Sequence, residues 1–338
     1  IIRQTINRKS VLPILNCIKL DVDRLTVTDL ETTVTMPFAS GLCVALDHND
    51  FLKIIETMEA ADFRYGTSEP DEKGFTYPII TGFSGNKSIK VAAFDVNEFP
   101  VDYRLVDEKR VEVGQLTTSD IEHLRTATHY TSNDDLRPSL NGINFDTNIT
   151  ATNGHWLYSI PLHKPMEVNF ILPIKAARLL TLIGGIWNIT FDGTTLFLDN
   201  GFYQIFARAV DATYPDYRCV IPTGKGNVLL KLNKKELVEE LKTCTKFANS
   251  NTSLVQFSIN GTINLHCEDK DFSKEYDTSL EKVSVLAKLP IKIGLSCQML
   301  LDIVKDIDQE IKMVMWAPNK AVIINDYFLL MPIYVKDE

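Results

Sequence analysis

The chain has 338 residues, of which 45% are hydrophobic and 23% are charged. This length allows two or three domains that each bury a core, and no run of about eighteen apolar residues predicts a membrane span. The net charge of −9 does not exclude a nucleic-acid partner, because the clustering of Lys and Arg matters more than their sum.

The chain opens at Ile1 without a charged-then-apolar leader, so we expect an incomplete N-terminus and not a signal peptide. Its six cysteines are scattered and include no CxxC pair. That spacing favours reduced, mostly buried thiols over a metal or redox site. These features predict a cytoplasmic protein without a metal or other cofactor.

The first part of the chain predicts a helix, a hairpin and a second helix. A short helix is expected over residues 1–5. Apolar and polar residues then alternate over residues 14–22 and 25–29, as in a hairpin with one buried face. A second helix is expected over residues 51–59.

The same elements recur in the middle of the chain. Ser119 and Glu122 have the spacing of a capping box, which predicts a helix over about residues 121–130. Alternating segments at 140–146 and 149–154 predict a hairpin, and a helix is expected over 174–183. Strands are expected over residues 186–191, 195–198 and 202–211.

A third copy follows. Asn233 and Glu236 open a helix that carries Leu237, Val238, Leu241 and Thr245 on one face. The Asn260-Gly261 turn predicts a hairpin between residues 255–259 and 263–267. A helix is expected over residues 298–307, with strands over 311–316, 321–324 and 327–335.

Three copies of one supersecondary unit predict three similar α+β domains, each with helices on one face of an antiparallel sheet. Polar, Gly and Pro residues break the pattern near Asp107–Lys109 and in residues 222–226. We therefore expect domains over residues 1–108, with an incomplete N-terminus, 109–226 and 227–338.

Several short segments point to one known family by their order along the chain. They are Leu12-Pro13-Ile14-Leu15, Thr28-Asp29-Leu30-Glu31, Leu140-Asn141-Gly142, Ala151-Thr152-Asn153-Gly154-His155, Tyr214-Pro215-Asp216-Tyr217-Arg218 and Leu330-Met331-Pro332-Ile333. Together they resemble the bacterial DNA polymerase III beta subunit, the DNA sliding clamp. The first two resemble the start of the family's first domain, the next three its second domain and the end of that domain, and the last its C-terminal segment.

The resemblance implies three repeated clamp domains per chain and a ring-forming, head-to-tail homodimer. Helices would lie inside the ring and antiparallel sheets outside. It places Ile89 and Val91, on a predicted edge strand, and Phe247 at the dimer interface. The implied role is a processivity factor without a catalytic site, which encircles double-stranded DNA and tethers DNA polymerase III and the clamp loader through short linear peptides.

Long cations on the helices that line such a ring would contact phosphates without reading bases. Lys235 and Lys242 are seven residues apart and share one helix face, although Glu239 interrupts it. The expected DNA-binding residues are Arg8, Lys9, Arg125, Arg137, Lys175, Arg178, Lys235 and Lys242.

The resemblance also implies an apolar socket for a partner peptide. Three features depart from the family pattern: Trp156 and Cys219 stand where basic residues are common, and the chain continues through Lys336-Asp337-Glu338. The expected socket residues are Leu140, Thr152, Gly154, His155, Trp156, Leu157, Pro215, Val220, Leu329, Met331, Pro332 and Ile333.

Two other functional classes stay open at this point. One is a clamp-fold scaffold that binds partners without encircling DNA, which a monomeric state would favour. The other is a hydrolase, but His155 has no accompanying nucleophile pattern or second spaced His. The sequence does not distinguish a chromosomal, phage or mobile-element origin.

Overall fold

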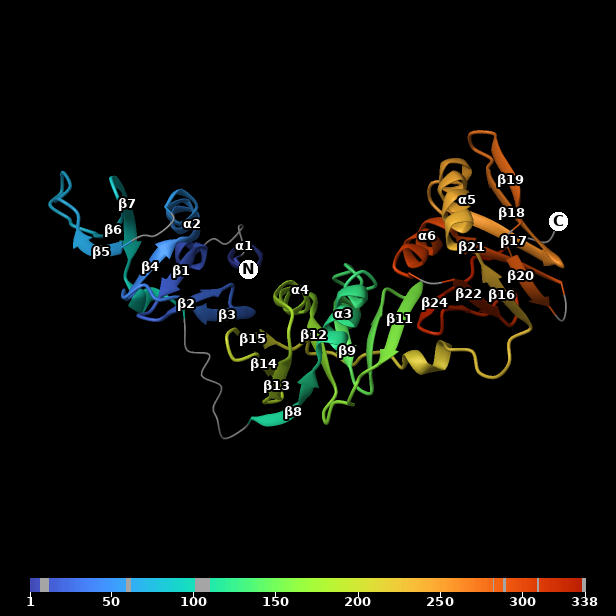
Figure 1. Ribbon diagram of the computed structural model, residues 1–338, viewed down its shortest axis with the longest axis horizontal. Helices are drawn as coiled ribbons and strands as arrows, with labels where there is room; N and C mark the ends of the chain where they lie inside the picture. The colour runs from blue at the N-terminus through green and yellow to red at the C-terminus, as the bar shows by residue number, and fades with distance from the viewer. Residues whose placement is uncertain are drawn as a thin grey trace. The chain divides into compact units, whose positions relative to one another are not determined.

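The computed structural model describes residues 1–6, 12–58, 62–100, 110–281, 283–287, 290–308 and 310–335 (Figure 1). Residue contacts divide the chain into two compact units. Unit 1 comprises Ile1–Arg125, Gly142–Thr147 and Leu162–Ala212. Unit 2 comprises Thr126–Asn141, Asn148–Pro161 and Thr213–Glu338. No helix among the described residues is both long and apolar enough to cross a membrane.

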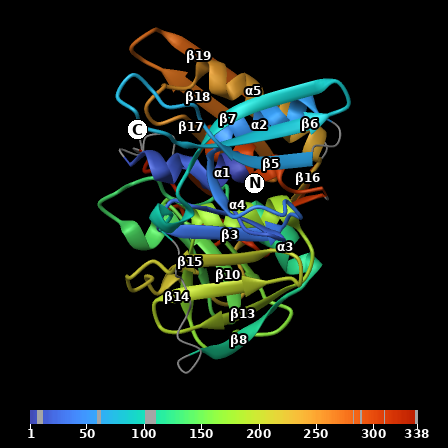
Figure 2. The ribbon, with the colours of Figure 1, turned by 90° about the vertical axis from the view of Figure 1, so that its left-hand side faces the viewer.

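Unit 1 is built on an eleven-stranded antiparallel sheet in the order β5-β6-β7-β4-β1-β2-β3-β15-β14-β13-β8. Figure 2 shows the part of this sheet from β3 to β8. The strands are β1 Cys17–Leu20, β2 Arg24–Thr28, β3 Thr32–Pro37, β4 Val44–Asp47, β5 Asp62–Thr67, β6 Pro78–Ser84, β7 Lys87–Phe94, β8 Val111–Leu116, β13 Trp187–Phe191, β14 Thr195–Asp199 and β15 Gln204–Arg208. The other elements are helices α1 Ile2–Thr5, α2 His48–Thr57 and α4 Ile174–Ile183, and the strand pair β9 Gly142–Phe145 with β12 Phe170–Pro173.

Unit 2 contains strands in the order β10-β11-β24-β23-β22-β16-β20 and a second sheet in the order β19-β18-β17-β21. Helices α5 (Lys234–Phe247) and α6 (Cys297–Lys305) pack side by side (Figure 1). The strands are β10 Asn148–Thr152, β11 Trp156–Pro161, β16 Val228–Leu232, β17 Leu254–Asn260, β18 Thr262–Asp269, β19 Lys274–Leu280, β20 Val283–Ala287, β21 Ile291–Ser296, β22 Ile311–Met315, β23 Val322–Ile324 and β24 Phe328–Leu330.

The helices bury the apolar faces that their sequences predict. In α5, Leu237 and Leu241 are fully buried, while Val238 and Thr245 are only half-buried at the edge of the predicted face. Cys244 completes the buried stripe. Burial of such a stripe supplies most of the stability of a protein helix.

The predicted α+β class is confirmed by the element order. In each third of the chain, a helix is followed by strands, a second helix and a final group of strands. The second helices are α2, α4 and α6, and α4 spans the predicted residues 174–183. The division into three domains stays a prediction, because compactness separates the chain into two units.

One helix start is as predicted and another is not. Asn233 caps α5, because its side chain accepts a hydrogen bond from Glu236 N at 3.1 Å. Helix α3 spans Thr118–Ala127, and the predicted box of Ser119 and Glu122 is wrong. Thr117 and Asp120 form the box instead: Asp120 N donates to Thr117 Oγ1 at 3.2 Å, and Thr117 N donates to Asp120 Oδ2 at 2.8 Å.

Several predicted ends also shift. Helices α2 and α6 end earlier than expected, and β24 covers only Phe328–Leu330 of the predicted residues 327–335. The Asn260-Gly261 hairpin is confirmed, with Gly261 at a φ of +74° between β17 and β18. Only glycine adopts such a φ without steric cost.

The strand that carries Ile89 and Val91 is not an edge strand along its whole length. Strand β7 lies between β6 and β4 in the sheet order. Its pairs with β4 involve only Ala93 and Phe94, whereas Ile89 and Val91 pair with β6. The predicted edge strand is therefore the first half of β7, where the described backbone pairs lie on one side of the strand only.

The corrected capping box can be tested by a pair of substitutions. Asp120 is buried and also accepts a hydrogen bond from His163 N at 3.1 Å, so Asp120→Ala removes a cap and takes the acceptor away from the N–H groups of Thr117 and His163. We expect the free energy of unfolding to fall by about 2 kcal/mol. Glu122→Ala, at an exposed position, should change it by less than about 0.5 kcal/mol. Urea denaturation measures both, and a larger effect for Glu122→Ala would contradict the structure.

Candidate functional site

An apolar cavity of about 290 Å³ lies within unit 2, beside the paired strands β11 and β24. Ten of the twelve predicted socket residues line it. They are Leu140, Thr152, Gly154, His155, Trp156, Leu157, Pro215, Val220, Leu329 and Met331. We call this cavity the β11–β24 pocket. A mostly apolar concave site with a few polar groups at its rim is typical of a binding site for a small molecule or a peptide segment.

One wall of the pocket is the turn between β10 and β11. Thr152 Oγ1 accepts a hydrogen bond from Gly154 N at 3.1 Å, and Asn153 Oδ1 accepts one from His155 N at 2.9 Å. Gly154 has a φ of +93°, and a Cβ there would lie 3.2 Å from Arg137 Nη1. The turn therefore requires glycine for its conformation and for the close approach of Arg137.

The neighbouring wall comes from β24 and the residue after it. Leu157 and Leu329 are paired across the two strands and both are buried. Met331 N then donates a hydrogen bond to His155 O at 2.9 Å, which holds the two walls together. The predicted residues Pro332 and Ile333 do not line the cavity, and Ile333 N instead bonds to Gly294 O at 2.8 Å.

Asp216 and Tyr217 line the pocket but were not among the predicted socket residues. Tyr217 is buried in a cluster with Leu157 and Leu329. Asp216 caps the short 3₁₀ helix η5 (Tyr217–Val220) by accepting a hydrogen bond from Arg218 N at 3.2 Å. Both residues lie in a segment that resembles the family, Tyr214-Pro215-Asp216-Tyr217-Arg218. The sequence pattern of this segment does not indicate which of its side chains face the cavity.

Trp156, one of the departures from the family pattern, packs inward. Its ring lies 4.9 Å from that of Tyr130, and Tyr130 is held by a hydrogen bond from its hydroxyl to Asp306 Oδ2 at 3.1 Å. Burial, together with the charge of Asp306, raises the pKa of Tyr130. The wall at Trp156 is therefore aromatic and neutral.

The rim of the pocket carries a negative charge. Cys219 Sγ donates a hydrogen bond to Asp216 Oδ2 at 3.0 Å, which lowers the pKa of that carboxyl group. The same hydrogen bond raises the pKa of the Cys219 thiol. The carboxylate at the rim is therefore stabilised, while the thiol beside it stays protonated to higher pH.

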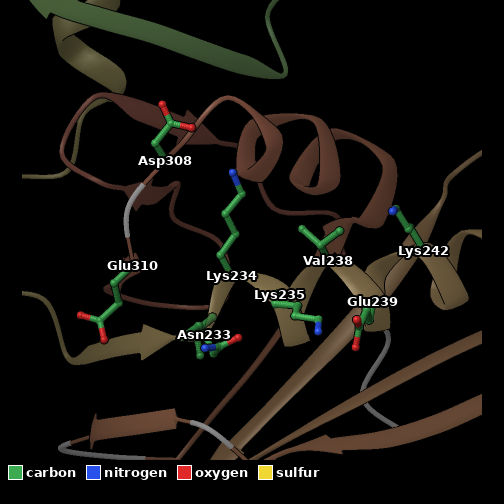
Figure 3. Close-up of a pocket in the computed structure, with 9 residues that line it drawn as sticks. Asn233, Lys234, Lys235, Val238, Glu239, Lys242, Asp308 and Glu310 are labelled. Atoms are coloured by element: carbon green, nitrogen blue, oxygen red, sulfur yellow. The ribbon is translucent and has the colours of Figure 1, made fainter.

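Lys235 and Lys242 are both exposed on α5, as predicted. They line an open groove with Lys234, Glu239, Asp308 and Glu310, and Figure 3 shows these side chains. Lys234 is already engaged, because its ammonium donates to the backbone oxygens of Lys305 and Ile307. The groove mixes both signs of charge, which favours weak contacts with phosphates over tight ones.

Of the four other predicted DNA contacts that the structure describes, three have partners in the fold. Arg125 donates to Thr181 O at 2.9 Å, and Arg137 pairs with Asp134. The ammonium of Lys175 contacts Asp29 and the backbone oxygen of Thr5. Arg178 is exposed on α4. Arg8 and Lys9 lie outside the described residues.

The three predicted interface residues lie on β7 and at the end of α5. Ile89 and Val91 are half-buried and alternate with exposed residues. Phe247 stacks on Tyr276 of β19, with 5.5 Å between the ring centroids. Tyr276 of β19 therefore faces α5. Ile89 of β7 lies opposite Gly82, where a Cβ would be 3.3 Å from Ile54 of α2, so it is also on the face that carries a helix.

One cluster in the described part of the chain could offer three metal ligands: His266, Glu275 and Asp277, whose donor atoms lie within 4.8 Å of one another. His266 Nδ1 lies 2.9 Å from Asp277 Oδ1, and both carboxylates are exposed. Such cross-strand charge pairs are common on sheet surfaces. The cluster alone therefore supports no metal site.

The effect of Asp216 on Cys219 predicts a change in thiol reactivity. Asp216→Asn removes the carboxylate that raises the thiol pKa, so a larger fraction of thiolate should form at pH 8 and alkylation by iodoacetamide should be faster. Mass spectrometry can follow Cys219, with exposed Cys43 as the internal reference. An unchanged ratio of the two rates would contradict the hydrogen bond between Cys219 and Asp216.

Comparison with known proteins identifies the fold. No protein-family model matches the chain, and no curated protein matches it in sequence. Many solved structures do match. The DNA polymerase III beta chain from Streptococcus pneumoniae has a TM-score of 0.85 at 16% identity, over 99% of this chain and 96% of that one.

Other sliding clamps give similar values. The DnaN sliding clamp from Bartonella birtlesii, solved with griselimycin, has a TM-score of 0.83 at 21% identity, over 99% of this chain and 95% of that one. The DNA polymerase III beta subunit from Thermotoga maritima has a TM-score of 0.81 at 20% identity, with the same coverage. This chain therefore has the fold of the DNA polymerase III beta-subunit sliding clamps.

Proposed function

We propose that the chain is a DNA sliding clamp subunit without catalytic activity. Two copies close head to tail around double-stranded DNA, with helices inside and sheets outside, and the chain acts in the cytoplasm. DNA polymerase III, the clamp loader and other replication proteins attach through short linear peptides. The observation that carries this proposal is a strand junction that occurs twice within the chain and can form once more between two chains.

The junction joins the third strand after the first helix of one repeat to the last strand of the next. Strand β3 pairs with β15, with Thr32 opposite Ala207. Strand β11 pairs with β24, with Trp156 opposite Leu330. Both pairs are antiparallel and extend a sheet from one repeat into its neighbour.

The corresponding strands of the first and third repeats are left open. Among the described residues, β19 pairs with β18 alone, and the first half of β7 pairs with β6 alone. An unpaired strand edge presents free N–H and C=O groups that favour pairing with another chain. A second copy of the chain offers both missing strands.

The register of this third junction follows from the other two. Phe94, Val210 and Ile333 occupy equivalent positions. Each bonds to or pairs with the strand that leads into the second helix of its repeat, at the residue three positions before that helix begins. Counting back along each strand makes Val91 equivalent to Ala207 and Leu330.

The register of β19 follows from the turn before it. Asp29 Oδ1 and Asp269 Oδ1 each accept a hydrogen bond from the N–H two residues later. Residues Thr28 and Glu268, directly before them, pair with Thr33 and Glu275. Glu275 is therefore equivalent to Thr33 at the β3–β15 junction.

These equivalences place three pairs of residues opposite each other across the proposed dimer interface. They are Val91 with Lys274, Lys90 with Glu275, and Ile89 with Tyr276. Tyr276 stacks on Phe247, so the apolar residues expected at the interface would meet on one face. Lys90 and Glu275 would meet on the other face as opposite charges, which stabilises a cross-strand pair.

The pocket and the exposed lysines supply the remaining parts of the proposal. The β11–β24 pocket would hold apolar side chains of a client peptide. The flexible side chain of Met331 would change its conformation to pack against different peptide residues. Bound ligands are known for similar clamps: griselimycin in the B. birtlesii protein, and polyethylene glycol at the proposed beta-motif tethering region of the C. crescentus clamp. Lys235, Lys242 and Arg178 would contact phosphates inside the ring.

A charge exchange tests the dimer register. Lys90→Glu or Glu275→Lys alone would place like charges opposite each other at both interfaces of the ring, and should weaken the dimer by about 10-fold. The double variant should recover most of the affinity. Sedimentation equilibrium measures the dissociation constant, with Lys73→Glu as the control at an exposed loop position. A double variant no better than the single variants would show that the register is wrong.

A covalent ring tests whether the protein encircles DNA. In a background without the exposed cysteines Cys43 and Cys219, the register places Val91→Cys opposite Lys274→Cys of the second copy. A short bismaleimide should then trap the dimer on nicked circular plasmid in detergent, and linearising the plasmid should release it. Equal loss from circular and linear DNA would instead favour a scaffold that does not encircle DNA.

The salt dependence of DNA binding, measured without the cross-linker, tests the lysines. Lys235→Ala with Lys242→Ala should lower the slope of log binding constant against log salt by about 2, since each phosphate contact contributes about 0.9. Filter binding over a salt series measures the slope. Lys73→Ala with Lys270→Ala, at exposed positions on other elements, should leave it unchanged.

A further inference from the structure

A second cavity, of about 220 Å³, lies within unit 1 beside the other strand junction. Its position on β3 and β15 corresponds to that of the β11–β24 pocket on its own strands. It is lined by Leu30, Glu31, Thr33, Thr194, Thr195, Phe206 and Arg208. We call it the β3–β15 cavity.

The turn before β3 has the same hydrogen bonds as the turn before β11. Thr28 Oγ1 accepts from Leu30 N at 3.1 Å, as Thr152 Oγ1 does from Gly154 N. Asp29 Oδ1 accepts from Glu31 N at 3.1 Å, in the way that Asn153 bonds to its turn. Leu30 even has a positive φ, +78°, where the other turn has a glycine.

The main-chain bond between the two walls also recurs. Arg208 N donates to Glu31 O at 3.0 Å, whereas Met331 N donates to His155 O at 2.9 Å. The two cavities therefore share one backbone framework at the strand junction. Five lining positions correspond: Leu30, Glu31, Thr33, Phe206 and Arg208 match Gly154, His155, Leu157, Leu329 and Met331.

The matched side chains differ in chemistry. Glu31 takes the place of His155, Arg208 that of Met331, and Leu30 that of Gly154. Glu31 and Arg208 form only a loose ion pair, at 3.9 Å, and both side chains are more than 60% exposed. An apolar guest at this junction would have to displace the water around both charges.

We propose that Leu30, Glu31 and Arg208 are specificity-determining residues that exclude apolar client peptides from the β3–β15 cavity. Each chain then offers one client site, at the β11–β24 pocket, although the backbone forms two. This inference rests on the proposed function of that pocket. Building unfavourable contacts against the wrong partner is a general route to specificity.

The first experiment transfers the charges into the β11–β24 pocket. The probe is a fluorescein-labelled hexapeptide that ends in two leucines, and anisotropy measures its binding to the full-length chain. His155→Glu with Met331→Arg should weaken binding at least 30-fold. The control creates the same charge pair elsewhere, with Asn188→Glu and Gln115→Arg on the paired strands β13 and β8. Binding by the pocket variant within threefold of wild type would overturn the proposal.

The second experiment removes the exclusion. Leu30→Gly with Glu31→His and Arg208→Met should raise the stoichiometry from one probe per chain to two. Adding His155→Glu and Met331→Arg to this triple variant should return the stoichiometry to one probe per chain. A triple variant that still binds one probe, and loses it with the pocket substitutions, would overturn the proposal. A wild-type chain that binds no probe would instead refute the client pocket, and this inference with it.

Discussion

Main-chain hydrogen bonding between strands of neighbouring repeats is the constraint on which the structure depends. A strand edge cannot be left unpaired in a packed protein without a free-energy cost or a risk of association. The chain meets this constraint by pairing β3 with β15 and β11 with β24. Among the residues that the structure describes, β19 and the first half of β7 each keep one unpaired edge, and a second copy of the chain would pair with both.

The two junctions share a backbone arrangement, and the side chains that line them differ in chemistry. The turns before β3 and β11 use equivalent hydrogen bonds, and both hold one residue at positive φ. Apolar residues make the β11–β24 junction a pocket, while Glu31 and Arg208 keep the β3–β15 junction polar. At the proposed dimer interface, Lys90 and Glu275 would make the third junction polar too. Repetition of a fold thus need not repeat its binding site.

Charge is distributed in a way that suits weak contact with DNA. The chain is acidic overall, yet Lys235 and Lys242 are exposed on one helix. Acidic neighbours such as Glu239 reduce the local potential, and Lys175 and Arg137 are engaged in ion pairs within the fold. A few screened cations hold a phosphate backbone loosely, which is what sliding requires.

The sequence alone determined the α+β class, the threefold order of elements, helix α4 to the residue and the Asn260-Gly261 hairpin. These features depend on local periodicity and turn chemistry, which a single chain segment displays. The pocket residues came from resemblance to a family and not from the pattern, and so Asp216 and Tyr217 were missed. Only the tertiary structure decided which residues cap α3, which part of β7 is open and which strands of different repeats pair. The strand pairings depend on contacts between segments distant in sequence, where several partners satisfy the same local pattern and packing selects one. At α3, two overlapping boxes had the same local pattern, and the box in use is the one whose Asp120 also bonds to the distant His163 N.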